Sequence, residues 1–430
     1  MRIRRVQSHL GGFSSCVIIR YIEIVLARIS DGSCSCIKTQ HLVRLISVML
    51  RGGHEMFEGK KLGFGLMRLP LTDANDKGSI DVEETKKMVD AFIEQGFTYF
   101  DTAWMYCAFK SENAVKEALT DRYPRDRYTL TTKLHAAYLK KKEDRDRIFE
   151  EQRQKTGVEY FDYYLIHAID QELYSIYNEM DCFNWLMEKK KQGLVKHIGF
   201  SYHDSAEFLD QVLTEHPEME FVQLQMNYLD WESAEVQSRK CYEVASKHGK
   251  PVIVMEPVKG GTLADVPVEV RESFAAYHPD LSVPSWAIRF VASLDNVAMV
   301  LSGMSNMEQL MDNISYMKEF VPMNAEETEL VHKAAEMIKD SIAIPCTGCS
   351  YCTEGCPMQI AIPDLFRVYN KSKRGEISDV EADEEYRQLT ESGGKARECL
   401  ACGQCQVACP QHLEIINYLK DVAKCMEKQD

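Results

Sequence analysis

The chain has 430 residues, of which 45% are hydrophobic and 27% are charged, and its formal net charge is −15. This composition is typical of a globular protein and excludes wholesale disorder. Because nucleic-acid affinity depends mainly on lysine and arginine side chains that neutralise phosphates, the acidic balance also argues against a nucleic-acid partner. The length is sufficient for two domains.

Residues 1–55 differ in composition from the rest of the chain. They carry eight Lys/Arg and three Asp/Glu, a charge of +5 that leaves −20 for the remainder. The apolar run from Cys16 to Ile29 contains three charged residues, whereas a membrane-spanning helix needs about 20 uninterrupted apolar residues. We expect neither a membrane anchor nor a secretory signal, and the Arg4–Arg5 pair is a poor match to a twin-arginine signal. We interpret residues 1–55 as a poorly ordered extension, with the functional protein starting near Met56.

Short β-rich segments alternate with amphipathic ones after this extension. The predicted strands cover residues 61–69, 97–103, 128–134, 160–167, 195–201, 221–227, 251–258 and 297–304. Helical patterns lie between them: residues 82–96 place Met88, Val89, Phe92 and Ile93 on one face and end at a glycine.

A second helical pattern covers residues 180–193, with Met180, Phe183 and Met187 on one face and lysines in its last turn. Eight strand–helix units predict a (β/α)₈ barrel over residues 56–320. The alternative, a doubly wound open sheet, would carry a glycine-rich phosphate turn after its first strand, and a proline stands there instead.

Polar residues stand at the carboxyl ends of the predicted strands, where a barrel of this kind gathers its functional groups. They are Asp101, Tyr106, Lys133, His167, Ser201, Gln223, Gln225, Asn227, Glu256 and Ser302. Each alone has a structural explanation, but their occurrence at equivalent points of successive strands indicates one shared site.

Four of these residues suit the reduction of a carbonyl group, which needs a hydride donor and a proton donor for the developing alkoxide. Tyrosine, with a pKa near 10, is a weak acid at neutral pH. We therefore expect Lys133 to lower the pKa of Tyr106 and Asp101 to keep Lys133 charged. His167 would donate to the carbonyl oxygen and orient it.

The segments FDTAWMY, TTKL and YYLIHA, which contain these four residues, resemble the catalytic segments of the aldo-keto reductases. The resemblance covers about residues 60–320. It implies a catalytic tetrad of Asp101, Tyr106, Lys133 and His167, and a barrel that binds an extended nicotinamide cofactor without a Rossmann fold. The cofactor contacts that it implies are Gly65, Met67, Ser201, Gln223, Glu256, Ser302, Gly303 and Asn313.

The cofactor half departs from the family pattern at four positions. Tyr202 stands where the family usually has Asn, Met255 replaces a stacking aromatic residue, Glu256 replaces Ser and Gln309 replaces Arg. The loss of this arginine removes a charge-assisted contact to an adenosine 2′-phosphate, so the choice between NAD and NADP stays open, as does a flavin.

Eight of the 15 cysteines lie in two C-terminal runs, CTGCSYCTEGCP from residue 346 and CLACGQCQVACP from residue 399. Each run has the spacing C-x₂-C-x₂-C-x₃-C-P of bacterial two-cluster ferredoxins, in which the fourth cysteine binds the other cluster. The spacing predicts two [4Fe-4S] clusters, one held by Cys346, Cys349, Cys352 and Cys409 and one by Cys356, Cys399, Cys402 and Cys405. A structural zinc site normally joins paired C-x₂-C arms, which this pattern does not match. We expect a reducing, cytoplasmic compartment.

The C-terminal domain is expected to cover residues 346–430. Helical patterns at 362–375 and 380–392 make it similar to the α-helical ferredoxin modules that accompany certain flavin-containing reductases. Residues 321–345 are expected to contain a connecting helix that Asn324 caps.

Hydride transfer moves two electrons whereas each cluster takes one, so the two halves predict an iron–sulfur oxidoreductase in which something converts between them. A bound flavin or a short-lived substrate radical could do so, with an external ferredoxin or flavodoxin as partner. The expected substrate is a small carbonyl compound, alcohol or activated alkene. The alternative is a plain NAD(P)H-dependent carbonyl reductase whose clusters are structural or redox-sensing.

Overall fold

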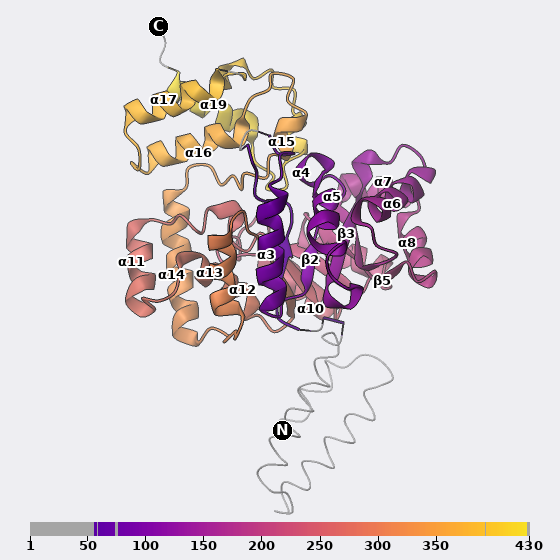
Figure 1. Ribbon diagram of the computed structural model, residues 1–430. Coiled ribbons are helices and arrows are strands. Elements are labelled where there is room, and N and C mark those ends of the chain that lie inside the picture. The colour runs from indigo at the N-terminus through magenta and orange to yellow at the C-terminus, as the bar shows by residue number, and fades with distance from the viewer. Residues whose placement is uncertain (1–55, 58, 74–75, 392, 428–430) are drawn as a thin grey trace, which may run out of the picture. The chain divides into compact units, whose positions relative to one another are not determined.

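Eight parallel strands close into a barrel in chain order, and helices surround them (Figure 1). This computed structural model describes residues 56–57, 59–73, 76–391 and 393–427. The strands are β1 (Leu62–Gly65), β2 (Tyr99–Asp101), β3 (Thr129–His135), β4 (Phe161–Ile169), β5 (Val195–Tyr202), β6 (Phe221–Gln225), β7 (Val252–Met255) and β8 (Val297–Gly303). Pairing of β8 with β1 closes the sheet.

At least one helix follows each strand. The α-helices of the barrel are α3 (Val82–Glu94), α4 (Tyr106–Phe109), α5 (Ser111–Val115), α6 (Glu143–Thr156), α7 (Gln171–Glu179), α8 (Cys182–Lys191), α9 (Ala206–Glu215), α10 (Ser238–Lys247), α11 (Val268–Tyr277), α12 (Val283–Ala292) and α13 (Met307–Met317). Shorter turns are the π-helical η3 (Lys116–Thr120) and the 3₁₀ segments η4 (Arg125–Arg127), η5 (Ala136–Tyr138) and η6 (Lys259–Gly261). The predicted (β/α)₈ barrel is therefore confirmed, and the open sheet is excluded.

Helix α3 begins and ends as the sequence predicts. Asp81 caps it, because its side chain accepts from the backbone N–H of Glu84, and the chain leaves the helix through Gly96, whose φ is +81°. Its buried face includes the four predicted residues. In α8 the predicted face is only partly right: Phe183 is buried with Cys182, Trp185 and Leu186, whereas Met180 and Met187 are half-buried. The helix starts after Asp181, so Met180 precedes it.

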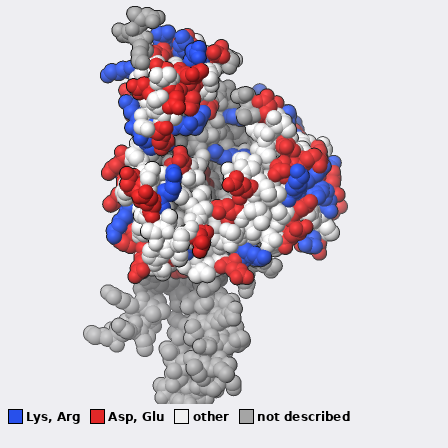
Figure 2. All heavy atoms as spheres, turned by 60° about the vertical axis from the view of Figure 1, so that its left-hand side comes forward, with Lys and Arg blue, Asp and Glu red and all other residues white. Residues whose placement is uncertain are grey.

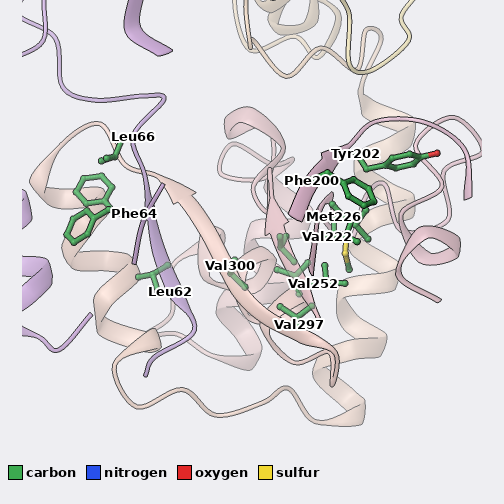
Figure 3. Close-up of a cluster of buried hydrophobic side chains, with 14 of the residues drawn as sticks. Leu62, Phe64, Leu66, Phe200, Tyr202, Val222, Met226, Val252, Val297 and Val300 are labelled. Atoms are coloured by element: carbon green, nitrogen blue, oxygen red, sulfur yellow. The ribbon is translucent and has the colours of Figure 1, made fainter. Parts of the chain in front are cut away.

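Two hydrophobic layers build the barrel. The outer layer lies between strands and helices, and Figure 3 shows part of it, with Leu62 and Phe64 from β1 and Val297 and Val300 from β8. The inner layer fills the barrel with Tyr99, Tyr163, Leu165, Phe221, Ile253, Met299 and Leu301. The ring of Phe57 stacks on that of Tyr163 with 4.9 Å between centroids, so residues before β1 contribute to the inner layer.

The C-terminal region is helical. Its elements are α14 (Ala325–Ser341), α15 (Tyr351–Glu354), α16 (Ile362–Lys373), α17 (Asp379–Thr390), the 3₁₀ segment η7 (Ala396–Glu398), α18 (Gln404–Val407) and α19 (Ile415–Met426). Asn324 caps α14 in a reciprocal capping box with Glu327, as its sequence predicts. Figure 1 shows α16, α17 and α19 side by side around a second small core.

The surface carries charges of both signs. On the face that Figure 2 presents, acidic and basic side chains are interspersed, without a continuous basic surface. No helix in the described ranges has the length and apolar character needed to cross a membrane. The extension expected over residues 1–55 lies outside the described residues, and the domain boundaries given above stay predictions.

Candidate functional site

Four polar residues, three from strands and one from the start of a helix, lie at the mouth of the barrel. Tyr99 and Leu165 point into the inner layer, so Asp101 and His167, two residues further on, point to the same side near the strand ends. Lys133 lies in β3, and Tyr106 starts α4 beyond β2. Residues that are far apart in the sequence therefore meet at one site, because the strands that carry them are parallel neighbours.

Lys133 is the central residue of this group. Its side chain is fully buried, and Nζ donates to Asp101 Oδ1 at 2.5 Å and to the backbone oxygen of Thr102 at 2.8 Å. The same Nζ lies 5.0 Å from the centroid of the Tyr106 ring, and the rings of Tyr106 and His167 are 5.9 Å apart. The structure therefore brings all four predicted residues together.

Burial dominates the electrostatics of the group. It raises the pKa of Asp101 and lowers that of Lys133, while their mutual attraction and the hydrogen bond between them oppose both changes. Burial and the neighbouring histidines and Lys133 lower the pKa of His167 well below its usual value, so His167 is neutral at pH 7. A neutral imidazole can donate a hydrogen bond to a carbonyl oxygen from one nitrogen.

The expected lowering of the Tyr106 pKa is wrong for this structure. Burial raises the pKa of Tyr106 well above 10, and nearby Tyr351 and Asp101 raise it further. Lys133 directs its hydrogen bonds to Asp101 and Thr102 rather than to the Tyr106 hydroxyl, so the attraction of its charge does not outweigh the effect of burial. Tyr106 is consequently protonated over the whole neutral range.

Unusual backbone conformations accompany the site. Three consecutive residues after Tyr106 have positive φ, namely Cys107, Ala108 and Phe109 at +50°, +51° and +66°. Ala168, directly after His167, and Glu256, directly after β7, both have φ of +54°. Non-glycine residues adopt this region rarely, and such strain clusters at sites where a side chain must be aimed.

A cavity of about 290 Å³ opens at the mouth. Seven of the eight predicted cofactor contacts line it: Gly65, Met67, Gln223, Glu256, Ser302, Gly303 and Asn313. Ser201 is not in the lining, and its Oγ accepts a hydrogen bond from the backbone N–H of Ala168 at 2.7 Å. Tyr106, His167 and Asp101 also border the cavity.

Four buried polar atoms of residues that line this cavity have no hydrogen-bond partner among the described residues. They are Oδ2 of Asp101, Nδ1 of His167, Nδ1 of His203 and Oε1 of Gln223. Buried polar groups are nearly always hydrogen-bonded, so these atoms fit a bound polar ligand. Asn313, by contrast, is fixed internally: its Nδ2 donates to Ser302 Oγ at 2.8 Å and its Oδ1 accepts from Tyr316 at 2.5 Å.

The eight C-terminal cysteines line two further cavities, four cysteines each. Cys346, Cys349, Cys352 and Cys409 line the first, and Cys356, Cys399, Cys402 and Cys405 line the second. These are the two sets that the crossed ferredoxin spacing predicts. No group of three or more histidine, cysteine or acidic side chains in the described chain surrounds a single ion position. Two groups of four thiols, each around its own cavity, fit the ligand sets of two iron–sulfur clusters.

The first cysteine set reaches the barrel mouth. Cys349 lines its own cavity and also the mouth cavity. Tyr351 and Pro410 line the mouth cavity as well. Arg68, from the loop after β1, donates to the backbone oxygen of Thr347 at 3.0 Å. A Cβ at Gly260, which has φ of +65°, would lie 1.8 Å from the same oxygen, so only glycine permits this approach.

A buried polar network joins Gln411, in the cysteine-rich region, to the barrel. Gln411 and Gln225 exchange side-chain hydrogen bonds of 2.8 and 3.0 Å, and Lys259 donates to Gln411 at 3.2 Å and to Asp230 at 2.6 Å. Asn227 also donates to Asp230, at 2.8 Å. Gln225 and Asn227, expected at the mouth, thus belong to this contact, and the sequence patterns gave no signal for Arg68, Lys259 or Gln411.

The fold and the residues at the mouth define a (β/α)₈ barrel with its site at the carboxyl ends of the strands. The chain is a member of the aldo/keto reductase family, because that family's model matches residues 61–336, which is more than half of the chain. Members of this family are oxidoreductases, as the sequence analysis expects. A model of a 4Fe-4S dicluster domain matches residues 345–414.

Solved structures show the same barrel. The aldo-keto reductase AKR11C1 from Bacillus halodurans, in its holo form, is 22% identical over 64% of this chain and 91% of its own, with a TM-score of 0.52. An aldo/keto reductase from Klebsiella pneumoniae, in complex with NADP and acetate, is 18% identical over 64% of this chain and 90% of its own, with a TM-score of 0.51. No curated protein sequence matches this chain at comparable stringency.

Proposed function

We propose that this protein is an iron–sulfur oxidoreductase that converts a small carbonyl compound, alcohol or activated alkene at the barrel mouth. Electrons are exchanged through two [4Fe-4S] clusters bound by the C-terminal cysteines. The observation that carries this proposal is the position of Cys349, which borders both the mouth cavity and the first cysteine cavity. One side chain thereby links the two halves.

Reduction of a carbonyl group adds a hydride to carbon and a proton to oxygen. A nicotinamide cofactor, when bound, supplies the hydride, and a bound flavin is the alternative. Tyr106 supplies the proton, because its hydroxyl stays protonated at neutral pH and borders the cavity. Neutral His167 donates a hydrogen bond that orients the oxygen, and Lys133, held by Asp101, stabilises the phenolate that proton loss leaves on Tyr106.

The residues that would hold the cofactor are those that the sequence analysis assigns to it: Gly65, Met67, Ser201, Gln223, Glu256, Ser302, Gly303 and Asn313, all but Ser201 in the lining of the mouth cavity. The unpartnered Oε1 of Gln223 supports this assignment. The NADP complex of the Klebsiella relative supports a nicotinamide cofactor in general. The choice between NAD and NADP is left to measurement.

One cluster is held by Cys346, Cys349, Cys352 and Cys409, and the other by Cys356, Cys399, Cys402 and Cys405. When bound, each transfers one electron at a time. The exposure of Cys402 supports an external ferredoxin or flavodoxin as the electron-transfer partner of the second cluster. The requirement for eight thiolates supports a reducing, cytoplasmic environment.

The direct test is purification without oxygen, followed by iron analysis and an absorption spectrum. The proposal expects roughly eight iron atoms per chain, a broad iron–sulfur band and its bleaching by NADH or NADPH, with or without added flavin. Iron-replete protein that neither nucleotide reduces, with any flavin added, would refute electron exchange between the halves.

A plain carbonyl reductase with structural or redox-sensing clusters is the second candidate. It is favoured by one observation, that Asp101, Tyr106, Lys133 and His167 are all supplied by the barrel. Cys349→Ala and Cys402→Ala discriminate between the two. NADPH-linked carbonyl reduction that is unchanged in folded variants supports the plain reductase, whereas its loss with an intact barrel supports electron exchange.

A further inference from the structure

The mouth cavity has one wall that does not come from the barrel. Cys349, Tyr351 and Pro410 border it, and all three belong to the cysteine-rich region. Tyr351 is the largest of them and begins α15, between the cluster ligands proposed above, Cys349 and Cys352. A side chain flanked this closely by two such ligands has little freedom once the cysteine set is assembled.

Tyr351 borders the same cavity as Tyr106, the proton donor proposed above. It shares the cavity lining with Tyr106 and His167, and among the neighbours that raise the pKa of Tyr106 it has the largest effect after burial itself. The two phenols thus border one cavity of about 290 Å³. A substrate that reaches Tyr106 therefore occupies the cavity that Tyr351 also borders.

The loop that carries Tyr351 is held against the barrel on both sides. Arg68 binds the backbone oxygen of Thr347 at 3.0 Å, and the close approach to Gly260 leaves no room for the loop to move inward. Further along the chain, the paired amides of Gln411 and Gln225 fix the segment that follows Pro410. These contacts hold the wall in a fixed position at the mouth cavity.

We propose that Tyr351 is a specificity-determining residue that contacts the substrate, so that the cysteine-rich region completes the substrate pocket of the barrel. The proposal rests on the proposed function at this same mouth. Its consequence is size selection: the Tyr351 ring limits the space next to the reacting carbonyl, and small carbonyl compounds are preferred over bulky ones.

The test compares Tyr351→Ala and Tyr351→Phe with wild-type holoprotein, using benzaldehyde and the bulkier 4-phenylbenzaldehyde as probes. One hydrophobic contact is worth about 10- to 200-fold in specificity. For Tyr351→Ala we expect the ratio of kcat/KM for the small probe to that for the bulky probe to fall at least tenfold, mainly through KM. Tyr351→Phe keeps the ring and should change the ratio less than threefold. Val380→Ala, at an exposed position of α17, is the control.

A merely structural role gives a different result. If Tyr351 only shields the cysteine cavity, Tyr351→Ala accelerates bleaching of the iron–sulfur band in air and leaves the selectivity ratio within twofold, which overturns the proposal. If Tyr351→Ala loses iron, Tyr351→Phe and Tyr351→Leu with full iron content are compared instead. A selectivity ratio that is unchanged in Tyr351→Leu also overturns the proposal.

Failure of the proposed function is recognised separately. If wild-type protein reduces neither probe, the iron and bleaching measurements above decide the proposed function, and Tyr351 is then judged by calorimetric binding of benzaldehyde. Binding at least tenfold weaker in Tyr351→Ala than in Val380→Ala sustains the contact. Equal affinities, or no binding to wild-type protein, overturn it.

Discussion

At the scale of single residues, the hydroxyl group of Tyr106 is the feature on which proton transfer depends. Tyr106→Phe removes this group and leaves the ring in its place between Lys133 and His167. General acid catalysis contributes about 10²- to 10⁴-fold, so we expect carbonyl reduction to fall by at least 100-fold. Cofactor affinity, measured by fluorescence titration, should change less than twofold. Turnover above a tenth of the wild-type rate would show that Tyr106 is not the acid.

Glu112 offers a residue-scale prediction about stability. It is buried in the barrel, where Thr132 and Gln152 donate to its Oε1 at 2.7 and 3.0 Å, and its Oε2 has no partner among the described residues. Burial raises the pKa of Glu112 from 4.5 to about 7. The unfolded chain therefore loses this proton at lower pH than the folded chain. The contribution of Glu112 to the free energy of unfolding is complete below pH 4.5 and declines as the pH rises to about 7.

Glu112→Gln should remove this decline, because an amide does not ionise and can accept the same two hydrogen bonds. We expect the variant to exceed wild-type protein in free energy of unfolding by up to about 3 kcal/mol at pH 8 and to match it near pH 4.5. Urea unfolding of the barrel at several pH values measures the difference. A gap that does not change with pH would contradict the assigned pKa.

The sequence could predict the meeting of these residues but not their proton affinities. Strand periodicity alone places Asp101, Lys133 and His167 on the inner face, and all three lie there. The raised pKa of Tyr106, however, depends on burial and on Tyr351, which is far away in the chain. No local pattern encodes that proximity.

At the scale of elements, the loop before α15 meets the turn after β7 at Gly260. A Cβ there would lie 1.8 Å from the backbone oxygen of Thr347, well inside contact distance. Gly260→Ala should therefore push the loop away from the barrel. We expect faster proteolysis between α14 and α15 and slower reduction of the iron–sulfur band by NADPH, with iron content retained.

The matched control is Gly375→Ala, between α16 and α17. Its φ of +69° resembles the +65° of Gly260, but no atom lies within 4 Å of the added Cβ. Backbone strain is thus similar in the two variants, and only the contact with Thr347 differs. Equal proteolysis of both variants would mean that this contact does not hold the loop.

Elements were predictable where the signal is local, and contacts between them were not. Caps and helix ends such as Asn324 and Gly96 follow from neighbouring residues, and the alternation of strands and helices predicted the barrel. The pairing of Gln225 with Gln411 joins residues 186 positions apart, and single amides in a sequence carry no sign of their partners. The cysteine runs were an exception, because their spacing predicted that Cys356 and Cys409 each join the cysteines of the other run, and these residues line the two cavities in that way.

At the scale of the whole molecule, the barrel and the cysteine-rich region differ in what stabilises them. The barrel has two extensive hydrophobic layers. The C-terminal core is small and includes Cys352, Cys405 and Cys409 among its buried residues. Small domains seldom bury enough apolar surface to be stable without metals or disulfides, so cluster binding and folding should be coupled in this region.

Removal of iron should therefore unfold the C-terminal region and leave the barrel folded. We expect anaerobic treatment with a chelator and a mild oxidant to increase hydrogen exchange strongly in peptides from residues 345–426, while peptides from β3, β4 and β6 keep their protection. Peptides around Arg68 and Lys259 should gain exchange as well, since their partners Thr347 and Gln411 are released. If the C-terminal peptides keep full protection after iron is lost, the region is held by its own core and its contacts with the barrel, and the thiols are not needed for its fold.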